Sequence, residues 1–250
     1  MAFEVVKAKR SAVVPQILLI GASNSGKTYS SLVLASSMGK HVGFVDTENK
    51  KSSYYADKFD FSVVYLKPPF TGDRYKGAIE AVVNQGCDVI VIDQITYEWG
   101  GSGGILNQVN DSPVNNDFAK WNEPSRRHAD FVDYLNFIKI PSIVCCRAKE
   151  QYEIQTDDRG KKVPVKIGLG PIQRGRNAGE GIEYEFPICF LLTEDHFAKV
   201  TSDKGGIFGK TVEDEEGKLK VVADPFIITA ETGRKIMSWA SGKSISKVKK

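Results

Sequence analysis

Short apolar runs alternate with amphipathic or polar segments along most of this 250-residue chain. Five runs predict buried strands, at 17–20, 41–46, 61–66, 89–93 and 142–147. Helices are expected between them, at 26–38, 47–58, 72–85 and 117–138. Strands that alternate with helices in this order favour an α/β fold with a doubly wound, mainly parallel sheet. Such a sheet binds ligands at the carboxyl ends of its strands.

The pattern changes toward the C-terminus. Residues 183–192 and 197–201 predict an antiparallel hairpin that turns at 194–196. Beyond about residue 211 we expect an acidic turn, a strand-like piece and a helix near 231–240. The expected organisation is a lead-in (1–13), a core (14–210) and a C-terminal extension that ends in a basic tail (211–250).

Two stretches of the core predict long mobile loops, at about 94–116 and 148–180. The first contains the sequence GGSGG at 100–104, and loops of this length are usually functional or mobile. In the second, Pro164 and Pro171 are expected to stop any regular element.

The first strand runs into Gly21, four further residues, and then Gly26, Lys27 and Thr28, which is the phosphate-binding pattern G-x-x-x-x-G-K-[ST]. Its glycines permit backbone N–H groups to face a phosphate, and the following helix adds its free N-terminal amides. We expect Lys27 to reach the β- and γ-phosphates of ATP and the Thr28 hydroxyl to bind Mg²⁺. The alternative, an ordinary glycine-rich turn, is disfavoured by the flanking strand and helix. The predicted nucleotide-binding residues here are Gly21, Ala22, Ser23, Asn24, Ser25, Gly26, Lys27, Thr28 and Tyr29.

Three carboxylates follow predicted strands and so fall at the same rim of the sheet. Asp93 closes the run VIVID and is expected to hold Mg²⁺ together with Thr28. Asp46 and Glu48 follow the second strand. A carboxylate at the end of a strand can also cap a turn, and for Glu48 alone both interpretations stay open.

A purely cationic stretch extends from residue 159 to residue 179 and contains no acidic residue. Positive charge in a flexible loop suits contact with the phosphates of nucleic acid. A solvated loop remains the alternative, because the stretch lacks aromatic residues for base stacking. The predicted DNA-binding residues are Arg159, Lys161, Lys162, Lys166, Arg174 and Arg176.

The aromatic residues of 117–138, among them Phe118, Trp121 and Phe131, are expected in the core. His128 is expected to be a surface or packing residue rather than a catalyst. The four cysteines lack C-x-x-C spacing and indicate buried, reduced thiols.

Charge and hydropathy place further bounds on the protein. A net charge of +3 argues neither for nor against nucleic acid as a partner. The N-terminus lacks an apolar signal core, and no stretch approaches the length of apolar sequence that spans a membrane. The expected location is the cytoplasm, with no membrane partner.

The order and spacing of these motifs resemble the RecA-type recombinase core. They resemble more closely the small phage-encoded RecA-like (AAA-family) ATPases of single-strand annealing and recombination. The resemblance covers roughly residues 14–210. It rests on the phosphate-binding loop, on FVDTE with Asp46 and Glu48, on Tyr55 seven residues later, and on VIVID with Asp93.

The resemblance implies specific roles. Glu48 is expected to activate the attacking water and Tyr55 to stack on the adenine. Two DNA-binding loops are expected at 100–116 and 148–180. Oligomers in the form of a ring or a filament are also implied.

The predicted hairpin resembles the element that reaches the nucleotide of a neighbouring subunit in this family. This suggests Lys199 and Lys204 as contacts in trans. The sequence departs from the family at Gln94, where a serine is usual, and at Arg147 and Lys149, which stand near the position of a glutamine sensor.

The resulting hypothesis is a Mg²⁺-dependent ATPase that acts on single-stranded DNA as a homo-oligomer. Its candidate catalytic residues are Lys27, Glu48, Asp93, Arg147, Lys199 and Lys204. Two alternatives stay open. One is an ATP-dependent loader or remodeller of a phage recombination or replication protein, and the other is a nucleotide-binding switch with little hydrolysis.

Overall fold

A mixed sheet forms the centre of the computed structural model, which describes residues 5, 7, 11–156, 162–176, 180–213 and 219–242. Within these residues nine strands join the sheet in the order β11-β8-β7-β1-β5-β4-β2-β3, and β6 pairs with β5. The strands are β1 (Gln16–Gly21), β2 (Val42–Asp46), β3 (Ser62–Tyr65), β4 (Val89–Asp93), β5 (Ser142–Thr156), β6 (Lys162–Pro171), β7 (Ile188–Leu192), β8 (Phe197–Asp203) and β11 (Phe226–Ile227). A separate antiparallel pair contains β9 (Lys210–Glu213) and β10 (Leu219–Val222).

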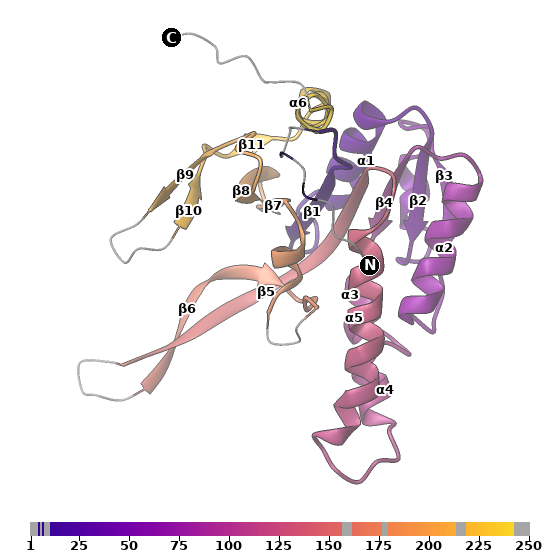
Figure 1. The fold of residues 1–250 in the computed structure, drawn as a ribbon, viewed down its shortest axis with the longest axis vertical. Coiled ribbons are helices and arrows are strands. Elements are labelled where there is room, and N and C mark those ends of the chain that lie inside the picture. The colour runs from indigo at the N-terminus through magenta and orange to yellow at the C-terminus, as the bar shows by residue number, and fades with distance from the viewer. Residues whose placement is uncertain are drawn as a thin grey trace.

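Helices cover both faces of the sheet (Figure 1). The α-helices are α1 (Lys27–Met38), α2 (Gly72–Asn84), α3 (Thr96–Gly100), α4 (Ile105–Asn110), α5 (Asn122–Asn136) and α6 (Ala230–Ala240). Three short 3₁₀ helices complete the chain: η1 (Lys51–Tyr55), η2 (Ala119–Trp121) and η3 (Ile182–Glu185). The α/β architecture and its C-terminal antiparallel strands confirm the fold class predicted from the sequence, with η1 shorter than the helix expected at 47–58.

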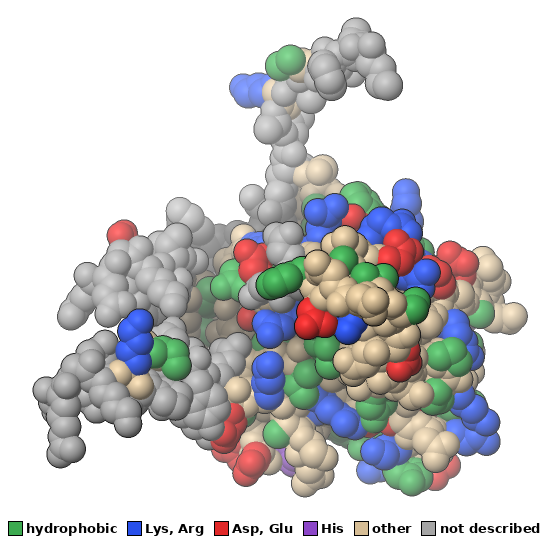
Figure 2. Space-filling view, turned by 90° about the horizontal axis from the view of Figure 1, so that it is seen from below, with side chains coloured by type: hydrophobic (Ala, Val, Ile, Leu, Met, Phe, Trp, Pro, Cys, Tyr) green, Lys and Arg blue, Asp and Glu red, His purple; other side chains and the backbone are tan. Residues whose placement is uncertain are grey.

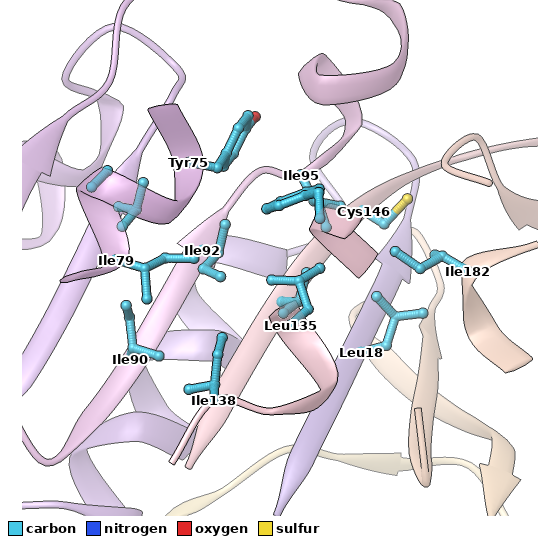
Figure 3. Close-up of a cluster of buried hydrophobic side chains, with 14 of the residues drawn as sticks. Leu18, Tyr75, Ile79, Ile90, Ile92, Ile95, Leu135, Ile138, Cys146 and Ile182 are labelled. Carbon is cyan, nitrogen blue, oxygen red and sulfur yellow. The ribbon is translucent and has the colours of Figure 1, made fainter. Parts of the chain in front are cut away.

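Two buried clusters hold these layers together, because successive residues of a strand point to opposite faces. Leu18 and Ile20 of β1 pack with α2 and α5 on one face (Figure 3). Ile17 and Leu19 pack with α1 and α6 on the other. The strands β1, β2, β4 and β5 are therefore buried on both sides, which explains why they appear in the sequence as nearly continuous apolar runs.

Parallel pairing brings the ends of these strands to one rim. Gly21 at the end of β1 lies in register with Arg147 of β5 and with Leu192 of β7. Asp46 at the end of β2 pairs with Asp93 at the end of β4. Residues far apart in the sequence thus meet beside the loop that follows β1.

The prediction of a mobile loop at 94–116 is wrong for α3 and α4. Trp99, Ile105 and Val109 of these helices are buried, so apolar contacts fix the segment. The glycines form the turn between the two helices, in which Gly101 N–H donates to Tyr97 O and Gly104 N–H donates to Gly101 O.

The prediction of a loop at 148–180 is also wrong over most of its length. Strand β5 continues to Thr156 and pairs antiparallel with β6, in a hairpin that projects from the body of the molecule (Figure 1). Pro164 lies within β6, and Pro171 is its last residue. Proline is tolerated there because β6 pairs only with β5 in the described residues, and an edge strand can lack a backbone donor.

Side-chain burial corrects one further expectation. Phe118 is 89% exposed at the start of η2, whereas Phe131 is buried as predicted. His128 is a packing residue, only 1% exposed, and all four cysteines are buried free thiols, as expected.

Candidate functional site

A cavity of about 650 Å³ opens at the carboxyl rim of the sheet, beside the loop that joins β1 to α1. Its walls come from segments that are distant in sequence: this loop, the region from β2 to η1, the end of β4, Arg147 within β5, the β7–β8 turn and β11. Ten predicted site residues line it: Ser23, Asn24, Gly26, Lys27, Thr28, Tyr29, Glu48, Tyr55, Asp93 and Arg147. Gly21, at the end of β1, and Ala22 and Ser25 of the following loop do not line the cavity themselves.

The loop has the geometry of an anion cradle. Gly26 adopts φ +84°, a left-handed conformation that favours glycine. At Gly21 an added Cβ would lie 2.2 Å from Ser25 Oγ, so the tight turn excludes a side chain there. Within the described residues no side chain caps α1, and its first turn contains no acidic residue. The positive end of the helix is therefore available to an anion without a competing carboxylate.

Lys27 lies over the same loop. Its Nζ donates hydrogen bonds to the carbonyl oxygens of Gly21 at 3.0 Å and Ala22 at 2.6 Å. The ammonium is thus held beside the cradle, where it can exchange these neutral acceptors for phosphate oxygens.

Thr28 and Asp93 meet across the rim. Thr28 Oγ1 donates to Asp93 Oδ2 at 2.5 Å, and the Asp93 residue is only 4% exposed. Burial raises the pKa of Asp93 to about 6, although the hydrogen bond from Thr28 opposes the shift. A hydroxyl and a buried carboxylate next to a phosphate cradle are oxygen donors of the kind that Mg²⁺ takes together with phosphate and water, so the residues fit this ion.

The raised pKa predicts that Asp93 destabilises the free protein at neutral pH. Its folded pKa of about 6 lies above the unfolded value of about 3.9, so its contribution to stability falls as pH rises through this interval. Asp93→Asn is expected to raise the free energy of unfolding by roughly 2–3 kcal/mol at pH 8 and by about half as much at pH 5. Denaturant unfolding at both pH values measures this difference.

The exposed Asp57 supplies the matched control, because Asp57→Asn removes a carboxylate from the surface. If Asp93→Asn gives the same change in stability at pH 8 and pH 5, the carboxylate is not destabilised by burial.

Glu48 stands at the wall of the cavity with its side chain 17% exposed. Its Oε1 accepts hydrogen bonds from Gln94 Nε2 at 2.6 Å and from Arg147 Nη2 at 2.5 Å. Its Oε2 lies 3.7 Å from Lys51 Nζ. These partners fix the position of the carboxylate. A carboxylate in this position can take a proton from a water molecule in the cavity once one of these bonds opens.

Asp46 has a structural role. It is 2% exposed, its Oδ1 accepts from Glu48 N–H at 2.7 Å, and its Oδ2 accepts from the N–H and hydroxyl of Ser52. The carboxylate therefore fixes the turn that carries Glu48.

Aromatic rings form one end of the cavity. The ring centroids of Tyr29 and Tyr55 are 6.2 Å apart, and Tyr29 meets Phe59 edge to face at 5.5 Å. Tyr55 lies where a planar base can pack against it, and its stacking role stays a prediction.

The structure adds cavity residues that sequence reasoning missed. They are Ser30, Lys51, Gln94, Asp195, His196, Ile227 and Ile228. The His196 ring folds over the phosphate-binding loop, and its Nδ1 would lie 3.0 Å from a Cβ added at Gly26. The turn at 194–196 was predicted, but only the parallel pairing of β7 with β1 brings it to the loop.

Two predicted cations lie elsewhere in this chain. Lys199 is exposed on β8 and does not line the cavity. Lys204 follows the opposite end of β8, where its Nζ donates to Tyr184 O at 3.0 Å. Their roles in trans stay predictions.

The described members of the predicted DNA-binding set lie either in β6 or in the residues that follow it. Lys162 is exposed at the start of β6, and Lys166 belongs to the same strand. Arg159 and Lys161 lie outside the described residues. Arg174 follows β6, while Arg176 is paired to Asp133, with its Nε 2.8 Å from Oδ1. On the face seen in Figure 2, described basic side chains lie among acidic and hydrophobic ones, so this part of the surface is not uniformly cationic.

A protein-family model described as an AAA domain matches residues 15–211, a range that contains the loop, Glu48, Asp93 and Arg147. The chain belongs to the AAA-domain family. A search of curated proteins finds no match to this AAA-domain protein. Among solved structures, the crystal structure of the RadB recombinase is similar, with a TM-score of 0.38 and 16% sequence identity, over 72% of this chain and 75% of that chain. This likeness is too distant to assign a role to any residue. None of the described helices combines the length and the apolar character needed to cross a membrane.

Proposed function

We propose that this AAA-domain protein is a Mg²⁺-dependent, RecA-like ATPase that acts on single-stranded DNA in recombination or annealing of the phage type. The observation that carries the proposal is a single cavity lined by Lys27, by the Thr28–Asp93 pair and by Glu48. A phosphate cradle, an oxygen pair suited to Mg²⁺ and a positioned carboxylate are the parts that phosphoryl transfer to water requires.

Each residue of the cavity has a distinct role in the proposed reaction. The loop amides and Lys27 bind the phosphates, and Tyr55 with Tyr29 packs against the base. Thr28 and Asp93 would hold Mg²⁺, which supplies charge neutralisation at the phosphate oxygens. Glu48 accepts the proton of the attacking water.

Cations complete the site. Arg147 already contacts Glu48 and can turn toward the γ-phosphate. Lys199 or Lys204 of a neighbouring copy in a ring or filament would add a second positive charge. A site that depends on a neighbouring copy makes the isolated chain slow.

Strand β5 supports coupling to DNA. It carries Arg147 at the cavity and continues into the hairpin that contains Lys162 and Lys166, two of the predicted DNA-binding cations. A ligand that moves the hairpin therefore acts on Arg147, which is hydrogen-bonded to Glu48.

Steady-state ATP hydrolysis tests the proposal directly. It is measured with and without single-stranded DNA, at low and moderate salt, over a range of protein concentrations. Stimulation that grows with protein concentration and fades with salt is expected. A rate indifferent to DNA contradicts the DNA-dependent function.

Three of the predicted DNA-binding cations have their own expected result. Lys161→Ala/Lys162→Ala/Lys166→Ala is expected to weaken binding of an oligothymidylate and to reduce the slope of log K against log salt by about 2, because each phosphate contact in a single strand contributes about 0.7. Fluorescence anisotropy over a salt series measures both quantities.

A matched control for this experiment is Lys40→Ala/Lys139→Ala. Both lysines are exposed. They precede β2 and β5, at the amino ends of these strands and so opposite the carboxyl rim. An unchanged salt slope in the hairpin variant shows that the hairpin does not contact the phosphates.

One observation favours a second function, an ATP-dependent loader or remodeller of a protein. Phe118 is 89% exposed and Val114 is 42% exposed between α4 and α5, close to the acidic residues Asp111 and Asp117. An apolar surface with acidic neighbours suits a protein better than a nucleic acid. ATP hydrolysis stimulated by a protein partner and indifferent to DNA would support this function.

A further inference from the structure

A second cavity, of about 540 Å³, lies beside the first at the same rim. Both cavities share Glu48 and Lys51 in their walls. The second cavity is otherwise formed by the turn after β2, by the end of β3 and the residues that follow it, and by Tyr97 of α3. Nothing in the mechanism proposed above uses it.

Its walls are largely aromatic and apolar. Phe70 stacks on Tyr97 with ring centroids 4.9 Å apart and an interplanar angle of 23°. Tyr97 also contacts Arg147, whose guanidinium carbon is 5.0 Å from the ring centroid. Tyr65 is 37% exposed at the edge of the sheet and adds a ring on which a planar group can stack.

The mouth of the cavity is cationic. Lys50, Lys51 and Lys67 line it, and Lys50 Nζ lies 5.4 Å from the centroid of the Tyr65 ring. Neither Lys50 nor Lys67 makes an ion pair with any of the described residues. Behind Lys67, the Arg74 guanidinium donates to the carbonyl oxygens of Lys67 and Pro69.

The acidic residues nearby leave Lys50 and Lys67 uncompensated, whereas Lys51 lies 3.7 Å from Glu48. Asp46 is buried and its oxygens are occupied by Ser52 and by Glu48 N–H. Glu48 is bound by Arg147 and Gln94. The cavity therefore combines unpaired positive charge with exposed aromatic surface, which is the chemistry that recognises a base and its phosphate.

We propose that the second cavity binds a nucleotide unit, with its phosphate at Lys50 and Lys67 and its base against Tyr65. The unit is either a free mononucleotide or one nucleotide of a single strand. Its phosphate also attracts Lys51, which otherwise lies beside Glu48. Occupancy of the second cavity thus changes the charge around Glu48, the residue proposed to take the proton of the attacking water. Only this effect on Glu48 rests on the proposed ATPase function.

Chemical protection tests occupancy without measuring hydrolysis. Full-length Lys27→Ala protein, in which the phosphate-binding loop is disabled, is treated with an amine-acetylating reagent in the presence of dTMP, of an oligothymidylate, or of neither. Mass spectrometry follows acetylation of Lys50 and Lys67 against that of Lys40 and Lys139. Acetylation of the cavity lysines is expected to slow at least about fivefold once the ligand concentration exceeds about four times Kd, because only the unoccupied fraction reacts.

The two ligands distinguish a site for a free nucleotide from a site for a nucleotide within a single strand. Protection by dTMP supports a site for a free nucleotide, and protection by the oligothymidylate alone supports a site for a strand. Protection by neither, or equal protection of Lys40 and Lys139, overturns the proposal. A failure of the proposed ATPase function would be seen in a different measurement. In that case the Lys27→Ala protein would still bind ATP.

Variants provide an independent measurement of affinity. Tyr65→Ala is expected to weaken ligand binding at least about fivefold, and Tyr65→Phe is expected to retain it, because the ring is what stacks. Tyr54→Ala removes a tyrosine that is 77% exposed and does not line the cavity, and so serves as the matched control. Equal affinities in Tyr65→Ala and Tyr54→Ala overturn the proposal.

Discussion

Replacing Lys27 with alanine is expected to weaken ATP binding at least about tenfold and to lower the hydrolysis rate about 100-fold or more. The Lys27 ammonium lies over the loop, bound to the carbonyl oxygens of Gly21 and Ala22. Its removal leaves the phosphates without the charge-assisted hydrogen bonds that hold them in the cradle. Titration with a fluorescent ATP analogue measures binding, and phosphate release measures turnover.

The Lys27 experiment needs a control for folding and one for charge. Circular dichroism on the same samples reports whether the variant keeps its fold. Lys40→Ala removes an exposed lysine from the opposite edge of the sheet. If Lys27→Ala binds ATP as tightly as the unmodified protein, the cavity is not the nucleotide site.

Glu48→Gln is expected to bind ATP with little change and to hydrolyse it about 100- to 10,000-fold more slowly. The glutamine keeps the shape and one acceptor oxygen for Gln94, but it cannot take a proton from water. The Arg147 guanidinium loses the charge of its partner, which is 2.5 Å away in the structure. Binding and single-turnover hydrolysis, measured separately, distinguish the two effects.

Glu80→Gln is the matched control, because Glu80 is exposed on α2 and does not line the cavity. A normal turnover rate in Glu48→Gln would remove Glu48 from the catalytic role. A loss of ATP binding in the same variant would instead assign the Glu48–Arg147 pair to the binding of nucleotide.

Local patterns determined much of this protein. The strands β1, β2, β4 and β5 were found from their apolar runs, because a strand buried on both faces leaves a continuous signal in the sequence. The loop after β1, Thr28 and Asp93 could be placed together from the sequence, because each lies at a strand end or a helix start. Parallel topology then makes such ends meet at one rim.

Glycine and proline do not predict loops where tertiary contacts decide the local structure. The glycines at 100–104 form a compact turn, because Trp99 and Ile105 are buried on either side. Pro164 is accommodated because β6 is an edge strand, a fact that depends on which strands pair and not on local sequence.

The sequence by itself determined the α/β layering, the glycine-rich loop and the carboxylates at the strand ends, because hydrophobic periodicity and turn residues are local properties of the chain. Only the tertiary structure decided which side chains meet across the rim. It tied Glu48 to Arg147, 99 residues away, and brought His196 over Gly26. It also placed a second, lysine-lined cavity next to Glu48. Such contacts arise from the order of strands in the sheet, and no spacing along the chain encodes that order.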